Sequence, residues 1–554
     1  MKNQWNPKAD LVITNAKIYT VALTIEEIKA GKTEFPILQR GYVAAKDGRT
    51  IAVGERPDDC LIGEHTSVID AGGMTLAPGF IDSHMHAIGA GTDLLDVNLE
   101  KASSKGEMLS AIGERAATTE KGRWIKASGW NELVWEDKET PTRRDLDSVT
   151  EGHPVVCVRA CHHVYAVNSK ALAMAGIAKD APNPDGGIIG RYEDGEPNGL
   201  LYENSAMDLI HRVMPPVDES KLVDAIKAIG AVINSFGITS CIDANLRPGM
   251  IRAYHKAHAL GALSYRSRMM FYLDQARGDA AYQLKKIEET PAVTGFGNDM
   301  LKFNGLKITL DGVPATGTAY MRKPYEHMPE TGGRTTFSQE DVYQMVDYAS
   351  SLGWQVGIHC CGDKAADIAI GAYISAYNKA REDLRHYIIH HSVVQPDQFP
   401  LLKEYGVPVA SQPTIALLLG EQNLIGEEMA GRYMYGKSYF DYGVILGGSS
   451  DFPVSPCSPL QGMYAAVTRL GADGRVWNEQ EKLTPAQALI MWTKNSAYFS
   501  HDDKRAGSVE VGNYADYVLL DAPILEVSPE RIRDAKVLYT IVDGKVVFRD
   551  NGAD

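Results

Sequence analysis

Residues 78–86 read PGFIDSHMH, an apolar run that ends in two histidines, His84 and His86. Side chains two residues apart in a β-strand point to the same side, so both imidazoles face one way. At the carboxyl end of an inner barrel strand, that side is the mouth of the barrel. Neutral imidazoles are good ligands for zinc and similar metals. This stretch therefore predicts a barrel strand that carries two metal ligands.

Seven further segments of the same strand-like kind follow along the chain. Helical stretches separate most of them, as residues 338–353 (SQEDVYQMVDYASSLG) do before the fifth strand. Eight strands alternating with helices predict an α/β fold with a closed (β/α)8 barrel of the TIM type. The eight predicted strands lie within residues 75–86, 238–245, 265–274, 306–312, 354–363, 386–392, 407–413 and 443–451.

The two ends of the chain have a different pattern, in which short apolar runs alternate with turns. This pattern is typical of antiparallel sheets, and Asp543-Gly544 is a strong hairpin turn. We expect residues 1–73 and 502–554 to form one composite β-sandwich, with the barrel spanning 74–501. Residues 95–220 are too many for a single helix between the first two barrel strands. They predict an inserted subdomain that covers the strand ends and the substrate.

Composition and charge narrow the class of protein. The formal charge of −15 is spread along the chain, which argues against nucleic acid or an anionic membrane as a partner. No apolar run reaches the ~18 residues of a membrane span, and the N-terminus does not resemble a secretory signal. The seven cysteines fit small buried residues in a reducing compartment. We expect a cytoplasmic protein with a small-molecule substrate, and a homodimer is the default expectation.

Other candidate ligands also stand where an apolar run ends. His359 ends WQVGIH, His390 and His391 end HYIIHH, and Asp451 ends GVILGGSSD. One such residue alone is more often a packed histidine or a loop cap, but four separate strand ends are hard to explain by chance. Nitrogen ligands with one carboxylate are the donor set of a hydrolytic metal site.

These motifs together resemble the amidohydrolase superfamily, in its branch of YtcJ-like proteins and N-substituted formamide deformylases (amidohydrolase family 3). PGFIDSHMH is similar to the first-strand motif, HCCGDKAAD to the fifth, RHYIIHHS to the sixth and GSSDFPVSP to the eighth. HVYAVNSKALAMAGI, PDGGIIGRYEDGEPNGLLYE and GSVEVGNYADYVLLD also match, so the resemblance covers nearly the whole chain. It implies metal ligands at His84, His86, His359, His390 and Asp451.

The sixth-strand motif leaves a choice between two adjacent histidines. The spacing from Arg385 selects His390, and strand alternation then turns His391 away. The chain departs from the family here, because Ile389 stands where an acidic residue is usual. His391 therefore remains the alternative.

Lys307, in LKITLDG, occupies the fourth-strand position where related enzymes carry a carboxylated lysine that bridges two metals. A carbamate supplies two anionic oxygens, whereas a free ammonium repels a cation. The alternative is an ordinary lysine paired with Asp311 or another carboxylate. One or two divalent ions are therefore expected, zinc by ligand type, with iron and manganese as alternatives.

Inside the insertion, the resemblance points to His163, and Trp130, Tyr165 and Asn168 are further candidates for reading the substrate. Packing of the insertion onto the barrel explains them equally well. Cys361 lies two residues beyond His359, on the inner side by alternation, and is a candidate pocket residue.

The predicted activity is metal-assisted hydrolysis of an amide-type C–N bond, as in an N-formyl or N-acyl amine. Asp451 is both a ligand and the proton shuttle, and His163 is the next candidate for the proton. The same site also suits an ester, a cyclic amide or a deamination substrate. A metal-containing binding or regulatory protein without turnover is the more distant alternative.

Overall fold

The computed structural model places the chain in two compact units, Met1–Ala87 with Gly230–Asp554, and Ile88–Ile229. In the described part of the chain, no helix combines the length and apolar character needed to cross a membrane. The described residues are 8–160, 164–184, 187–215, 218–274, 278–326, 328–380, 383–418 and 425–552.

The first unit contains eight parallel strands that form a nearly closed barrel, which confirms the predicted fold class. Each of them overlaps one predicted segment, but β15 begins at Leu301, before the predicted start at residue 306. They are buried along almost their whole length, as parallel strands covered by helices are, and so they read as continuous apolar runs. The strands are β6 (Phe80–Met85), β13 (Ile238–Leu246), β14 (Arg266–Leu273), β15 (Leu301–Thr309), β16 (Val356–Cys360), β17 (Tyr387–His390), β18 (Val409–Ser411) and β19 (Leu446–Gly448).

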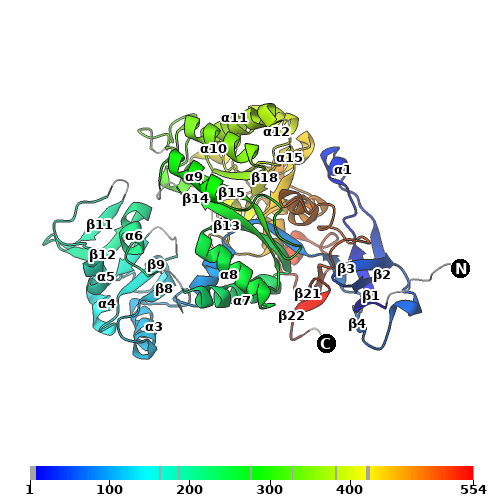
Figure 1. Ribbon diagram of the computed structural model, residues 1–554, viewed down its shortest axis with the longest axis horizontal. Helices are drawn as coiled ribbons and strands as arrows, with labels where there is room; N and C mark the ends of the chain where they lie inside the picture. The colour runs from blue at the N-terminus through cyan, green and yellow to red at the C-terminus, as the bar shows by residue number, and fades with distance from the viewer. Residues whose placement is uncertain are drawn as a thin grey trace. The chain divides into compact units, whose positions relative to one another are not determined.

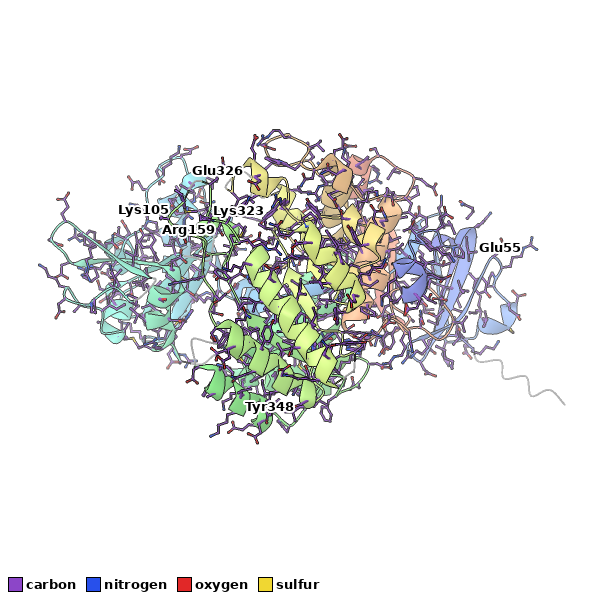
Figure 2. The ribbon with its side chains drawn as sticks, turned by 90° about the horizontal axis from the view of Figure 1, so that it is seen from above. Glu55, Lys105, Arg159, Lys323, Glu326 and Tyr348 are labelled. Carbon is purple, nitrogen blue, oxygen red and sulfur yellow. The ribbon has the colours of Figure 1, made fainter. Side chains whose placement is uncertain are left out.

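Helices follow most of these strands and lie around them, as Figure 1 shows. Helices α10 (Gln339–Ser351) and α11 (Asp363–Ala380) pack side by side outside β16 (Figure 2). Helix α10 begins with a capping box in which Ser338 and Asp341 satisfy each other's main-chain N–H groups. The other barrel helices include α8 (Pro248–Ala259), α9 (Ala280–Glu289), α12 (Phe399–Glu404), α15 (Lys437–Tyr442) and α16 (Pro459–Thr468).

Both chain ends contribute to one eight-stranded sheet, called here the end sheet. The predicted segment 75–86 in fact contains two strands, because Pro78 and Gly79 break it. Strand β5 pairs with β1 and β20 in the end sheet, whereas β6 enters the barrel. A Cβ at Gly79 would lie 2.2 Å from Thr239 Cγ2, so only glycine fits this crossing. The sheet contains β1 (Leu11–Tyr19), β2 (Ile37–Lys46), β3 (Arg49–Gly54), β4 (Ser67–Asp70), β5 (Thr75–Pro78), β20 (Tyr517–Leu520), β21 (Val537–Val542) and β22 (Lys545–Arg549).

The second unit, Ile88–Ile229, is built on a six-stranded mixed sheet. Its strand order is β11-β12-β10-β9-β8-β7, with parallel pairs from β7 to β9 and antiparallel pairs beyond. The strands are β7 (Val97–Asn98), β8 (Ile125–Trp130), β9 (Val155–Arg159), β10 (Val164–Val167), β11 (Ile188–Arg191) and β12 (Pro197–Tyr202). The predicted boundaries at 73, 95, 220 and 502 stay predictions.

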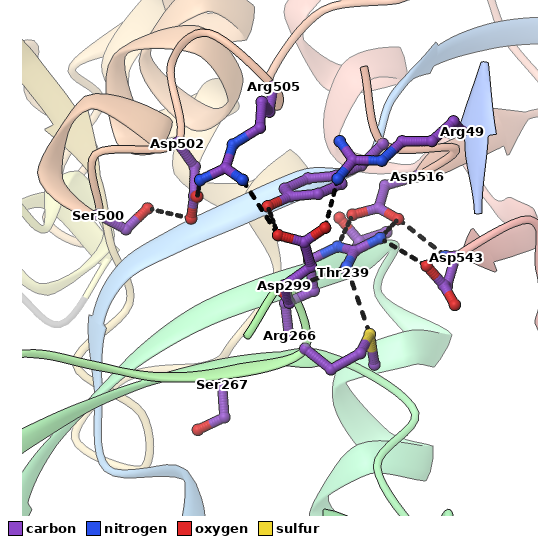
Figure 3. A network of polar contacts seen from close by, with 12 residues as sticks. Arg49, Thr239, Arg266, Ser267, Asp299, Ser500, Asp502, Arg505, Asp516 and Asp543 are labelled. Atoms are coloured by element: carbon purple, nitrogen blue, oxygen red, sulfur yellow. Dashed lines mark hydrogen bonds and ion pairs between the residues drawn. The ribbon is translucent and has the colours of Figure 1, made fainter. Parts of the chain in front are cut away.

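Arg266, the first residue of β14, joins the barrel to the end sheet (Figure 3). Its side chain is 1% exposed, and its guanidinium makes two bonds to Asp516, of 2.7 and 2.9 Å. It also contacts Asp543 at 3.2 Å and lies 3.8 Å above the ring of Tyr514. The free energy of burying such a guanidinium depends strongly on its two bonds to the carboxylate partner.

We expect Arg266→Met to destabilise the first unit by about 3–5 kcal/mol, because Asp516 would remain buried without its cation. Urea denaturation followed by fluorescence measures this change as a lower midpoint. Arg533→Met removes an exposed pairing with Asp534 and should leave the midpoint unchanged. Equal midpoints for the two variants would show that the Arg266 contacts do not hold the barrel to the sheet.

Candidate metal centre

The candidate ligands lie at the carboxyl ends of four barrel strands. His84 is in β6, with His86 just beyond it, and His359 and His390 are in β16 and β17. Asp451 follows β19. The imidazole of His84 lies 5.2 Å from that of His86 and 5.4 Å from that of His390, between ring centroids. His359 and His390 are 4.3 Å apart by the same measure. Side chains from distant parts of the sequence therefore meet at one place.

One group of donors consists of His84, His86 and Asp451. The Nε2 atoms of the two histidines lie 3.2 and 3.1 Å from Asp451 Oδ1. Donors around one tetrahedral ion, with bonds of ~2.0–2.1 Å, are separated by about 3.3 Å. Asp451 Oδ1 is buried between these nitrogens and, among the described residues, has no hydrogen-bond partner in good geometry. The three atoms thus converge on a common point, which fits a divalent ion.

A second group consists of His359, Cys361 and His390, whose donor atoms lie within 4.8 Å of one another. Gln412 fixes the orientation of His390, because its Oε1 lies 2.8 Å from His390 Nδ1. The Gln412 amide nitrogen donates to Ser449 Oγ and Ala410 O, so its oxygen must face the imidazole. Nδ1 therefore carries the proton, and Nε2 keeps its lone pair for a metal.

Two of the candidate ligands have left-handed backbone conformations. His390 has φ +76° and Asp451 has φ +56°, which non-glycine residues rarely adopt. The Asp451 main-chain N–H donates to His84 O at 2.9 Å and holds this conformation against the first strand. Such strain is typical of functional sites, where the surrounding structure fixes an unfavourable conformation.

The adjacent His391 is turned away from this cluster. Its Nε2 lies 2.9 Å from Gln398 Oε1, and its Nδ1 lies 2.7 Å from the hydroxyl of Tyr439. Both nitrogens are thus engaged outside the centre. Arg385, the residue from which the motif spacing is counted, donates to Tyr498 O and Asp503 Oδ1. It therefore makes its contacts away from the donor cluster. The structure places His390, and not His391, beside the other donors.

Burial sets the charge of the centre. Together with the charge of Lys307, burial lowers the pKa of His84 and of His359 to about 3, so both imidazoles are neutral. Burial alone would raise the pKa of Asp451, but its contacts with His84 and His86 outweigh burial and hold that pKa well below its usual range. Burial also lowers the pKa of Lys307 to about 8. Neutral imidazoles beside an ionised carboxylate are ready to bind a cation.

Three buried residues support the centre that sequence patterns did not single out. Asp311, considered above only as a partner for Lys307, accepts main-chain N–H groups from Tyr320, Cys361 and Gly362 at 2.8–3.0 Å. Asp82 accepts the Ser450 hydroxyl at 2.5 Å, which links β6 to the loop that carries Asp451. Gln412, the third, directly follows β18. The only sequence signal for these roles is a polar residue next to a buried strand end.

The candidate residues of the second unit have contacts within that unit. Asn168 caps helix α5 (Ser169–Met174) by accepting from Ala171 N, and the buried indole of Trp130 donates to Cys157 O. The hydroxyl of Tyr165 lies 2.7 Å from His211 Nε2. His163 lies outside the described residues. A role in substrate binding stays a prediction for all four.

The model of one protein family, the amidohydrolase family, matches residues 67–548. The chain belongs to the amidohydrolase family. It is therefore a hydrolase of the class named for cleaving carbon–nitrogen bonds, and the donors at its strand ends fit the divalent metal on which such hydrolases depend.

Two relatives illustrate how far the sequence likeness extends. The chain is 28% identical to the putative amidohydrolase YtcJ of Bacillus subtilis, over 87% of this chain and 90% of the relative. It is 26% identical to the N-substituted formamide deformylase of Arthrobacter pascens, over 98% and 99%. These matches confirm the predicted YtcJ-like branch.

Solved structures confirm the fold. An uncharacterized metal-dependent hydrolase from Pyrococcus horikoshii superposes with a TM-score of 0.76 at 24% identity, over 94% of this chain and 99% of its own. A similarly described hydrolase from Pyrococcus furiosus gives a TM-score of 0.74, also at 24% identity, over 93% and 100%.

We expect the purified protein to contain about one to two equivalents of divalent metal, because its imidazole and carboxylate donors converge. His84→Ala combined with His86→Ala should remove the ion that these residues share with Asp451. Inductively coupled plasma mass spectrometry measures the content. Exposed His65→Ala is the matched control and should retain the wild-type amount. Wild-type protein without metal after growth in zinc would contradict the assignment.

Proposed function

We propose that this chain hydrolyses the C–N bond of an N-formyl or N-acyl amine at the barrel mouth. The observation that carries the proposal is the convergence of His84, His86 and Asp451 on a common point, beside His359 and His390. The named activity of the relative from Arthrobacter pascens supports the choice of an N-formyl amine. We expect zinc from the ligand types, with iron or manganese as alternatives.

His84, His86 and Asp451 would hold one ion, and His359 and His390 would hold the same or a second ion. When bound, a divalent ion lowers the pKa of water and polarises the substrate carbonyl. The neutral imidazoles supply nitrogen donors without adding charge of their own. Gln412 keeps the His390 ring in position through Nδ1.

Asp451 is the proposed proton carrier. Its Oδ1 lies next to the Nε2 atoms of His84 and His86, so it can also reach a water molecule bound among these donors. Asp451 takes one proton from the attacking water as the new C–O bond forms. It then delivers this proton to the amine nitrogen as the C–N bond breaks, which releases the acid and the free amine. His163 is the proposed alternative carrier.

The test is turnover on a panel of N-formyl and N-acyl amines, with esters, cyclic amides and aminated rings as competing substrates. We expect release of formate or another acid from the amines, and metal-loaded protein that cleaves none of the panel would contradict the proposal. On the best substrate, Asp451→Asn should lower kcat by about two to four orders of magnitude, because the amide cannot accept the proton.

The Asp451→Asn variant should keep its histidine-bound metal, measured by metal analysis of the same sample. Asp441→Asn, in an exposed pair with Lys437, is the control and should keep the wild-type kcat. A near wild-type kcat in metal-loaded Asp451→Asn would show that another group carries the proton, and His163→Ala would then be measured.

We further propose that Lys307 is carboxylated and bridges two ions. Burial lowers its pKa to about 8 and so increases the share of neutral amine, which is the form that reacts with carbon dioxide. Lys307→Ala should then lose one equivalent of metal by mass spectrometry, and added short carboxylates should restore part of the activity. Arg469, another buried cation, lies in a separate network, and Arg469→Met should keep the metal. An unchanged metal content in Lys307→Ala would contradict the bridge.

A further inference from the structure

One sulfur atom lies among the nitrogen donors of the centre. Cys361 directly follows β16, is 3% exposed, and places its Sγ 3.5 Å from His359 Nε2. Its Sγ and the donor nitrogens of His359 and His390 lie within 4.8 Å of one another. The five ligands that the family motifs imply do not include a thiol, so this atom is additional to them.

Hydrogen bonds fix the backbone around Cys361, and the backbone in turn sets the direction of the Cys361 side chain. Its main-chain N–H donates to Asp311 Oδ1 at 3.0 Å, and the next N–H, of Gly362, donates to Oδ2 at 2.8 Å. A side chain at Gly362 would place its Cβ 2.0 Å from Tyr320 O, so the loop packs tightly here. Strand alternation turns Cys360 to the opposite face. The loop thus directs Cys361, and not Cys360, toward His359.

The separation of sulfur and nitrogen has the size that a shared metal ion requires. With bonds of ~2.3 Å to sulfur and ~2.0–2.1 Å to nitrogen, a tetrahedral ion holds the two donors about 3.6 Å apart. The distance between Cys361 Sγ and His359 Nε2 is 3.5 Å. Without an ion, the same nitrogen can hydrogen-bond to the thiol or to Gly312 O, which lies 3.3 Å away. The arrangements therefore differ in whether the imidazole nitrogen and the thiol keep their protons.

The charge of the centre favours the thiolate. An imidazole binds a metal in its neutral form, so His359 and His390 would not offset the charge of an ion between them. Asp451 is the one anion among the five implied ligands, and its Oδ1 lies with His84 and His86. The proposed carbamate on Lys307 would add a second anion. An ion between His359 and His390 would gain an anionic donor directly from Cys361. Buried cations need such compensation.

We propose that Cys361 supplies a thiolate to a metal ion held by His359 and His390. This inference rests on the metal centre of the proposed function. On binding, the S–H bond breaks, the sulfur electron pair forms the bond to the ion, and the proton passes to solvent. A soft sulfur donor favours zinc over magnesium, calcium or manganese at this position.

X-ray absorption spectroscopy of the zinc-loaded full-length protein tests the proposal. We expect a Zn–S shell at ~2.3 Å in the wild type, in addition to Zn–N and Zn–O bonds at ~2.0–2.2 Å. Cys361→Ser should lose this shell, and Cys360→Ser should keep it, because the neighbouring thiol faces the other way. In cobalt-loaded protein, a sulfur-to-cobalt charge-transfer band should follow the same pattern.

A wild-type spectrum with only nitrogen and oxygen neighbours would overturn the thiolate while leaving the metal centre intact. A sulfur shell that persists in Cys361→Ser would also overturn it. Wild-type protein that binds no metal would instead overturn the proposed function, together with this inference. If Cys361→Ser fails to fold, the wild-type spectrum still decides between sulfur and a purely nitrogen and oxygen environment.

Discussion

Hydrogen bonds between the first and last barrel strands bring the metal donors together. Strands β6 and β19 are the two ends of the barrel sheet. In the described residues they do not pair as strands, and hydrogen bonds from side chains and loop atoms join them instead. Ser83 Oγ donates to Gly448 O at 2.9 Å, Asp451 N donates to His84 O at 2.9 Å, and buried Asp82 accepts from Ser450. Loss of these hydrogen bonds would separate Asp451 from His84 and His86. The proposed hydrolysis therefore depends on them.

The closure also explains how two ligands keep unfavourable backbone conformations. A non-glycine residue in the left-handed region costs of order 1–3 kcal/mol, and both His390 and Asp451 adopt it. Main-chain bonds at Asp451 and the Gln412 contact at His390 over-determine these positions. Both side chains reach the cluster of donors from these backbone conformations. Support from outside the ligand set is therefore part of the site.

The sequence predicted the barrel because buried parallel strands read as uninterrupted apolar runs, and it predicted the donors because each ends such a run. His390 could be separated from His391 by motif spacing and alternation, as the engaged nitrogens of His391 illustrate. The division of residues 75–86 between two sheets could not be seen, since both strands are apolar. The roles of Asp82, Asp311 and Gln412 depend on partners far along the chain or on loop geometry, which local patterns do not encode.

The loop at position 361, two residues beyond His359, is held through main-chain atoms, whereas the ligands are held through their side chains as well. Asp311 holds this loop through main-chain N–H groups, which any residue but proline supplies at position 361. The main chain of the loop is thus held whichever side chain stands there, but Cys361 is packed in an apolar cluster with Ala319 and Val393, so a replacement must have a similar size. A residue of similar size at this position would change the softness and charge of the donor set while the main-chain bonds to Asp311 stay in place. In this chain, the thiol of Cys361 stands at that position beside His359 and His390, where a thiolate would add a soft anionic donor for a divalent ion.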